Sequence, residues 1–238
     1  MKKSLILLKE IKNHRDGYHL NSKYWQEWKK FLPALSSELR EIAIGMVLSD
    51  ACMYKKSNHA LIKFEQGYLQ EEFLLHLFSI FKIYCFMIKP GNRIELTGER
   101  KGLIKSLWFK TFSHSSFDDI WELFYIKSSD NKYPIKIIRE GLILDHLTDR
   151  GLAFWIMGDG SLQKDKKTMI LHTQSYNQNE NIILSKELNK KFSFKSEVIL
   201  HKKKYFVIKF HSEDGLILHN LIKPYIHKSM AYKIPIYL

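Results

Sequence analysis

The sequence predicts an α+β protein made of two pseudo-symmetric halves that meet at a pair of helices. Two apolar runs, residues 43–51 and 152–160, each end abruptly in one carboxylate, Asp50 or Asp159. The two acids lie 109 residues apart, which is close to half of the 238-residue chain. Each run is followed by the same order of expected elements: strands, an amphipathic helix, further strands and a last helix. This repetition predicts a duplicated unit in which the two acids share one site.

In the first half, the acid-tipped helix is expected to begin after Ser36 and Ser37, because serine is a common helix N-cap. Glu38 and Glu41 then occupy the opening turns, where the helix dipole favours acidic side chains. Hydrophobic periodicity predicts the remaining elements of this half. They are strands at 60–65 and 83–89 and helices at 71–82 and 117–125.

The second half repeats this order. Thr148 and Asp149 are suitable caps for the second acid-tipped helix. Three consecutive lysines, residues 202–204, separate two alternating segments, and this pattern predicts a hairpin tip. Pro224 is expected to end the last helix. The other expected elements are strands at 168–174, 197–201 and 205–210 and helices at 179–191 and 212–222.

The chain divides into four segments. Residues 1–35 form a basic and aromatic N-terminal extension, 36–134 the first half, 135–146 a linker and 147–238 the second half. Because the linker is short and polar, the two halves are expected to pack tightly instead of moving on a long tether.

The composition narrows the classes of function. Lysine and arginine together number 38 against 25 acidic residues, and this net charge of +13 favours a polyanionic partner, most simply nucleic acid. Cys52 and Cys85 lack metal-ligand spacing and the histidines form no ligand pattern, so zinc is not expected. No stretch approaches the ~20 apolar residues of a membrane span, so no membrane partner is expected. A cleavable secretory signal is not expected either.

Paired carboxylates on a pseudo-two-fold axis indicate a site for divalent metal. Hydrolysis of a phosphodiester requires an activated water, stabilisation of the phosphorane charge and a neutralised leaving oxygen, and a metal ion can provide all three. Carboxylates are the hard oxygen ligands that Mg²⁺ prefers. A Lys-x-Pro sequence closes each half, and its lysine is expected to stabilise developing charge. The predicted catalytic residues are Asp50, Asp159, Lys132 and Lys233, with the two acids as ligands of Mg²⁺, which Mn²⁺ is expected to replace.

Basic side chains cluster in the loops after each acid and on strands with one polar face. Such loops can follow phosphates on both sides of a cleft, and the polar face of a strand can read base edges in a major groove. The alternative is that these residues are an ordinary solvated surface. The predicted DNA-binding residues are Lys55, Lys56, Lys63, Gln66, Lys164, Lys166, Lys167, His172, Gln174, Lys202, Lys203, Lys204 and Lys209.

Together these residues resemble the LAGLIDADG homing endonucleases in the single-chain form with two motif copies. The nine-residue motif of that family maps onto 43–51 and 152–160, and Asp50 and Asp159 fall at its catalytic acid. The resemblance covers about residues 36–236 and includes the segments 220–225 and 232–235.

The resemblance implies two αββαββα halves whose saddle-shaped antiparallel sheets straddle double-stranded DNA. It further implies a monomer that makes a metal-dependent double-strand break with 3′ overhangs in a long asymmetric target, for intron homing. Location in mitochondria, or elsewhere inside the cell, is expected. Two other functions stay open: an intron maturase that binds RNA to assist splicing, and a DNA-binding protein without cleavage. The presence of both acids and both Lys-x-Pro sequences argues against a complete loss of cleavage.

Two positions depart from the family pattern. Gly45 suits the close packing of the motif helices, but Phe154 stands where the family often has glycine, so an asymmetric interface is expected. Lys63 stands where a water-positioning glutamine is expected in the first half.

Overall fold

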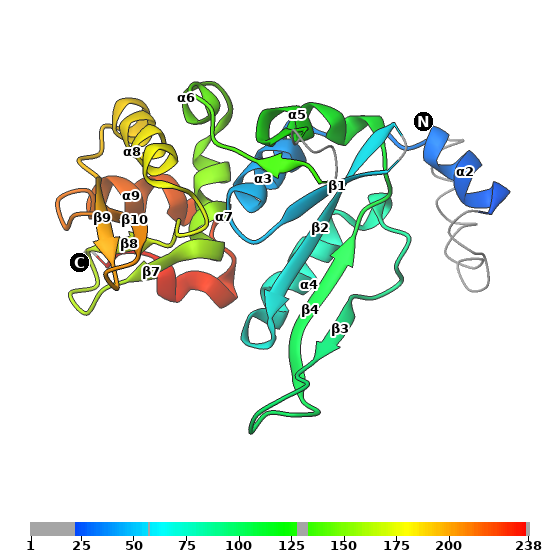
Figure 1. The fold of residues 1–238 in the computed structure, drawn as a ribbon, viewed down its shortest axis with the longest axis horizontal. Helices are drawn as coiled ribbons and strands as arrows, with labels where there is room; N and C mark the ends of the chain where they lie inside the picture. The colour runs from blue at the N-terminus through cyan, green and yellow to red at the C-terminus, as the bar shows by residue number, and fades with distance from the viewer. Residues whose placement is uncertain (1–21, 57, 128–132, 237–238) are drawn as a thin grey trace.

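The computed structural model describes residues 22–56, 58–127 and 133–236 and shows two α+β halves side by side. They meet along α3 (Ser37–Leu48) and α7 (Asp149–Asp159), which lie at the middle of Figure 1. Each half contains one four-stranded antiparallel sheet. The predicted fold class is therefore confirmed. Among the described residues, no helix combines the length and apolar character that a membrane crossing requires.

The sheet of the first half has the strand order β1-β2-β4-β3. The aromatic ring of Phe64 lies 4.7 Å from that of Phe109 and 4.9 Å from that of Phe81, so one face of this sheet is the core. The long β3–β4 hairpin projects away from the body of the molecule (Figure 1). The elements are β1 (Cys52–Lys56), β2 (His59–Gly67), α4 (Glu71–Ile80), β3 (Gly91–Ile94), β4 (Ile104–Lys110) and α5 (Asp118–Phe124).

The strand expected at 83–89 is wrong. Residues Lys82–Tyr84 form the 3-10 turn η2, and Cys85 makes only an isolated bridge to Thr111. This segment is apolar because Tyr84 and Cys85 are buried in the core, not because it is pleated. The further 3-10 turns are η1 (Tyr68–Gln70), η3 (Ser115–Phe117), η4 (Lys223–Tyr225) and η5 (Lys228–Lys233).

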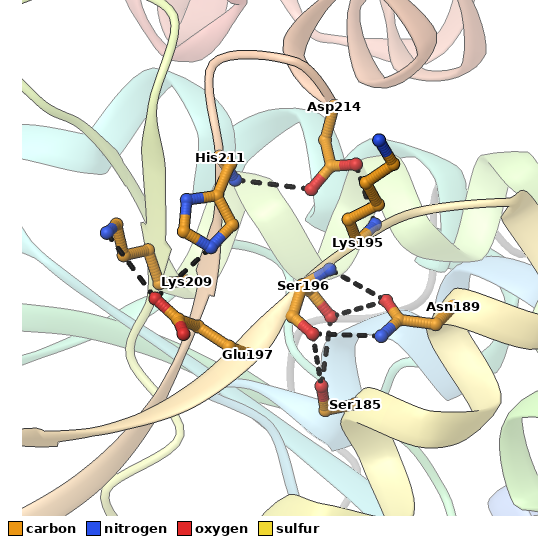
Figure 2. A network of polar contacts seen from close by, with 8 residues as sticks. All are labelled: Ser185, Asn189, Lys195, Ser196, Glu197, Lys209, His211 and Asp214. Carbon is orange, nitrogen blue, oxygen red and sulfur yellow. Dashed lines mark hydrogen bonds and ion pairs between the residues drawn. The ribbon is translucent and has the colours of Figure 1, made fainter.

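The sheet of the second half has the order β7-β8-β10-β9. Figure 2 shows how α8 is tied to the start of β9: Asn189 accepts from the backbone N–H of Ser196 at 2.8 Å, and Ser185 contacts the Ser196 hydroxyl at 3.0 Å. Asn177 and Glu180 form a capping box at the start of α8. The elements are β7 (Gly160–Leu162), β8 (Met169–Leu171), α8 (Gln178–Phe192), β9 (Glu197–His201), β10 (Tyr205–Phe210) and α9 (Gly215–Ile222).

The segment 135–146, expected to be a linker, contains regular structure. Its strand β6 (Ile135–Lys136) pairs with β5 (Tyr125–Ile126), and α6 (Leu142–His146) follows. The Glu187 carboxylate accepts from the backbone N–H groups of Ile143 and Leu144 at the start of α6, at 2.8 and 3.3 Å. Lys191 donates to the carbonyls of the same two residues. The linker is thus held along α8.

The described part of the N-terminal extension forms the short basic helix α2 (Lys23–Lys30). Trp25 is completely buried, and its ring lies 5.4 Å from those of Phe86 and Phe112. Helix α2 is therefore anchored to the first half through aromatic packing.

Candidate active site

The motif helices α3 and α7 pack backbone to backbone. A Cβ atom on Gly45 would lie 2.1 Å from the carbonyl oxygen of Gly151, so no side chain fits there. One turn nearer the helix ends, a Cβ on Gly158 would lie 2.5 Å from Ser49 Oγ. Small residues at these crossings let the two helix axes approach closely, which brings the C-terminal ends of both helices to one place.

Phe154 does not enter this backbone contact. Its ring lies 6.0 Å from Phe73 and 6.4 Å from His76, both on α4, so it faces the helix of the opposite half. His76 stacks in turn on His227, at a centroid distance of 4.6 Å. Gly45 and Phe154 occupy corresponding motif positions and make different contacts, so the interface is asymmetric, as the sequence predicted.

Asp159 is the last residue of α7, and Asp50 lies two residues beyond the end of α3. Asp50 accepts a hydrogen bond of 3.0 Å from the buried Gln66 amide, and a Cβ on Gly158, the residue before Asp159, would lie 3.1 Å from Asp50 Oδ2. Burial and the neighbouring Asp50 carboxylate raise the pKa of Asp159 to about 8. Surrounding protein likewise raises the pKa of Asp50, although Gln66, Lys233 and Lys136 oppose this. Burial is the main cause for both acids, and the neighbouring charge of Asp50 adds to the rise for Asp159.

Two lysines hold the ends of the motif helices in the same way. Lys233 donates to the carbonyls of Met157 at 2.5 Å and Gly158 at 3.0 Å at the end of α7. Lys136 donates to the carbonyl of Val47 near the end of α3. Lys136 and Lys233 are therefore equivalent in the two halves.

Both ammonium groups are withdrawn from solvent beside the acids. Burial lowers the pKa of Lys136 to about 8, while the charges of Asp159 and Asp50 oppose this shift. Burial also lowers the pKa of Lys233, again opposed by the two acids. Among the described residues, neither lysine forms an ion pair with Asp50 or Asp159 within 4.0 Å, because both donate to backbone carbonyls instead.

Lys132, the predicted partner of Lys233, lies outside the described residues. The sequence reasoning missed Lys136, because the Lys-x-Pro pattern directed attention to Lys132. Pairing of β5 with β6 places Lys136 opposite Tyr125, and this register brings it to α3. The available signal was a second lysine two residues after Pro134, and nothing in the sequence distinguishes it from Lys132.

The convergence of two helix C-termini makes the site electronegative. The last carbonyls of a helix carry partial negative charge, and here two sets of them lie beside two carboxylates. Tyr176 from the second half donates to the carbonyl of Leu48 at 2.7 Å, which adds a third donor to those of Lys136 and Lys233. The arrangement is suited to attract a divalent cation to the acids.

The predicted glutamine and lysine roles in the first half need correction. Gln66, and not Lys63, reaches Asp50. Lys63 is only 6% exposed and forms an ion pair with Glu65, so its charge is already matched within the protein. Gln66 is only 5% exposed and bonded to the acid, which removes it from the surface that was predicted to read bases.

The other predicted DNA-binding residues lie at the surface or at sheet edges. His172 is half-buried and its Nε2 lies 2.9 Å from Ser161 Oγ. Lys209 forms an ion pair of 3.5 Å with Glu197 (Figure 2). Lys56 belongs to β1. The exposed members are Lys55, Lys164, Lys166, Lys167, Gln174, Lys202, Lys203 and Lys204.

The sequence matches the LAGLIDADG DNA endonuclease family over residues 40–218. The chain belongs to this family. Both copies of its motif lie on the paired helices α3 and α7, so the resemblance inferred from the sequence is confirmed.

Relatives of this LAGLIDADG protein have been named as endonucleases and as a maturase. The probable intron-encoded DNA endonuclease 3 of Mycosarcoma maydis is 52% identical over 134 residues, 56% of this chain and 96% of that protein. The probable intron-encoded endonuclease 1 of Wickerhamomyces canadensis is 31% identical over 96% of this chain and 98% of that protein. The cytochrome b mRNA maturase bI2 of Saccharomyces cerevisiae is 29% identical over 96% of this chain but only 54% of its own length.

A solved structure shows the same arrangement of both halves. The homing endonuclease I-WcaI, bound to its DNA recognition sequence, matches with a TM-score of 0.83 and 29% identity, over 95% of this chain and 99% of that chain.

Proposed function

We propose that this LAGLIDADG protein is a site-specific homing endonuclease that cuts both strands of a long, asymmetric DNA target. The observation that carries the proposal is the convergence of Asp50 and Asp159 at the ends of two packed helices, each beside a lysine that donates to helix-end carbonyls. The likeness to I-WcaI bound to DNA and a net charge of +13 support double-stranded DNA as the partner.

The two acids suit a divalent metal ion. Among the described residues, neither carboxylate has an ion-pair partner, and burial raises the pKa of both, so a bound cation would stabilise their ionised forms. No cluster of three or more histidine, cysteine or acidic residues that could hold a metal ion exists in the described part of the chain. Mg²⁺ commonly uses one or two protein carboxylates together with water and substrate phosphates, so the pair is sufficient.

Asp50 and Asp159 are the residues that would hold the metal. A bound divalent cation supplies Lewis-acid stabilisation of phosphoryl oxygens and a more acidic water. We extend the proposal to Mg²⁺, with Mn²⁺ as a substitute, and to products with 3′ overhangs. The family likeness supports these details.

The lysines and Gln66 act on the chemistry in other ways. Lys136 and Lys233 place one cationic group beside each half of the site, where it stabilises charge that develops on the phosphate. A pKa of about 8 also lets Lys136 exchange a proton near neutral pH. Gln66 orients Asp50 through its 3.0 Å hydrogen bond, and the second half has no glutamine in the corresponding contact with Asp159 among its described residues.

We further propose that the protein acts as a monomer in the mitochondrion. Two complete halves within one chain make a second copy unnecessary for a two-acid site. The names of the relatives, intron-encoded endonucleases and a cytochrome b mRNA maturase, support an organellar origin.

The alternative function is that of an intron maturase, and the likeness to maturase bI2 favours it. A cleavage assay on a plasmid library with a randomised insert, with and without Mg²⁺, separates the two. We expect double-strand cuts at a restricted set of sites by the wild type, and none by Asp50→Asn or Asp159→Asn. Binding to the selected site should weaken steeply with salt, because many phosphates are neutralised. Tight binding of intron RNA by a wild type that cuts no DNA would favour the maturase.

A further inference from the structure

The two sheets carry different side chains at equivalent positions of the face that lies opposite the core. In the first half, Phe64 pairs with Phe109 of β4, and Arg93 pairs with Ser106, which precedes Phe109 by three residues. In the second half, Leu171 pairs with Ile208 of β10, and His201 pairs with Tyr205, which precedes Ile208 by three residues. Arg93 on β3 therefore corresponds to His201 on β9. By the same register, Glu65 corresponds to His172.

Glu65 is the centre of a polar cluster on this face. Its Oε1 accepts from the Ser106 hydroxyl at 2.6 Å and lies 3.0 Å from Arg93 Nε, and its Oε2 binds the buried Lys63 ammonium. Burial alone would raise the pKa of Glu65, but Lys63, Ser106 and Arg93 together lower it. The carboxylate is thus ionised and held by Lys63, Ser106 and Arg93. It is therefore not free to accept a hydrogen bond from a DNA base.

Arg93 is left with one side of its guanidinium unused. The ion pair to Glu65 uses Nε, and no hydrogen bond to the described residues uses either terminal nitrogen. The side chain is 57% exposed. Since a guanidinium is a rigid planar fork, fixing Nε restricts the direction in which the terminal nitrogens point. Two parallel donors in a fixed direction match the O6 and N7 acceptors of guanine in the major groove.

The surroundings of Arg93 leave room for a base edge. An open depression of about 460 Å³ lies beside it, lined by residues of β2, β3, β4 and the β3–β4 loop. Its lining residues are Glu65, Arg93, Ile94, Glu95, Leu96 and Lys105.

The equivalent place in the second half offers different chemistry. His172 and His201 lie edge to face there, with a centroid distance of 5.8 Å, so a histidine stands where the first half has Glu65. The two halves consequently present different donor patterns to the two half-sites.

We propose that Arg93 reads a guanine in the half-site bound by the first sheet, and that Glu65 is the positioning residue that orients it. This inference rests on the proposed function of DNA cleavage. Good bidentate pairs discriminate between bases by roughly 5- to 150-fold, so the preference is measurable.

The test is a cleavage profile on substrates that each carry one base-pair change across the site selected by the wild type. We expect one position at which guanine is preferred, and we expect Arg93→Gln and Glu65→Gln to abolish the preference at that same position. The double variant should lose no more than either single variant, because Glu65 acts through Arg93. Glu65→Gln leaves the buried Lys63 unpaired, so Lys63→Met/Glu65→Gln is the second variant if the first does not fold.

Lys195→Gln and Glu213→Gln are the matched controls. They break an exposed acid–lysine pair of 3.0 Å in the second half, and they should leave the base preference unchanged. An even loss across all positions in Arg93→Gln would show a phosphate contact and overturn the inference. Unchanged preference in the folded Glu65 variants would do the same. A wild type that cuts no DNA would overturn the proposed function and this inference together. If the wild type cuts DNA but the Arg93 and Glu65 variants change the base preference at no position, the inference alone is overturned.

Discussion

Glu41 and Arg150 form an ion pair of 3.0 Å between α3 and α7, and they occupy the same position in the two motif helices. Their separation of 109 residues equals that of Asp50 and Asp159. In a symmetric dimer, residues at this place near the axis would carry like charges. The ion pair therefore exists only because the two halves have diverged within one chain, and it favours the pairing of unlike halves.

Arg150→Glu should destabilise the protein by about 1–2 kcal/mol, because it places three acids, with Glu38 and Glu41, at one helix crossing. Urea unfolding monitored by circular dichroism measures the change. The swapped variant Glu41→Arg/Arg150→Glu should recover a large part of the loss. If the swap is as unstable as the single variant, charge pairing between the halves is not the cause.

Gly45→Ala should be more harmful than Gly151→Ala. The new Cβ at Gly45 would meet a backbone carbonyl at 2.1 Å, whereas at Gly151 the nearest backbone atom, the carbonyl oxygen of Glu41, would lie 3.1 Å away. Overpacking of this kind costs about 1–3 kcal/mol. Because Gly45 lies close to Asp50, we expect cleavage to fall further than stability accounts for. Urea unfolding and single-turnover cleavage are measured on both variants. Equal losses of stability and of cleavage rate in the two variants would contradict the prediction.

Lys136→Met and Lys233→Met should each reduce the cleavage rate by roughly 10²- to 10³-fold, by analogy with the removal of one electrostatic contact to a transition state. DNA affinity should change little, because both lysines are buried against backbone carbonyls. The matched comparison is Lys132→Met, which tests the original sequence prediction. A larger loss in Lys132→Met than in Lys136→Met would restore Lys132 to the catalytic role.

Addition of Mg²⁺ should raise the melting temperature of the wild type, since a ligand that binds only the folded state stabilises it. Asp159→Asn removes a carboxyl group whose pKa is raised to about 8 by burial and then by the charge of Asp50. In EDTA near pH 8, this variant should therefore be at least as stable as the wild type, and Mg²⁺ should stabilise it less. Scanning fluorimetry of the wild type and of Asp159→Asn, each with and without Mg²⁺, gives the four melting temperatures. Equal stabilisation of both proteins would contradict metal binding by Asp159.

Acid should loosen the contact between His76 and His227. Burial and then the charge of His227 lower the pKa of His76, and burial chiefly lowers that of His227. Folded-state pKa values below the unfolded value of about 6.5 mean that protonation favours unfolding. Their contribution to stability is complete above pH 6.5 and is lost as the pH falls below it.

His76→Asn should reduce the slope of unfolding free energy against pH between about pH 7 and 5. Urea unfolding of both proteins across this range measures the slopes. An unchanged slope would show that other histidines account for the acid sensitivity. His219→Asn is the control, because the His219 Nδ1 lies 2.6 Å from the carbonyl oxygen of Pro235 and not against His76 or His227.

The sequence determined much of the local structure of this protein. The serine and threonine caps located the starts of α3 and α7, and apolar periodicity located α4 and α8. The duplicated acid-tipped runs pointed to Asp50 and Asp159, because the same apolar run ending in an aspartate occurs twice in the chain. The same repeat gave the family and the asymmetry of the two halves.

Tertiary structure alone decided which side chains meet the acids. Lys136 reaches α3 through the register of β5 and β6, and Gln66 reaches Asp50 because of where β2 passes the helix end. Lys63 and Arg93 both pair with Glu65, which also accepts from Ser106, so residues of β2, β3 and β4 meet in one polar cluster. Strand register and helix approach depend on packing between residues distant in sequence, and a shift of one residue moves a side chain to the other face. The local pattern of residues therefore specifies the elements and their acids, whereas their partners follow only from how the elements pack.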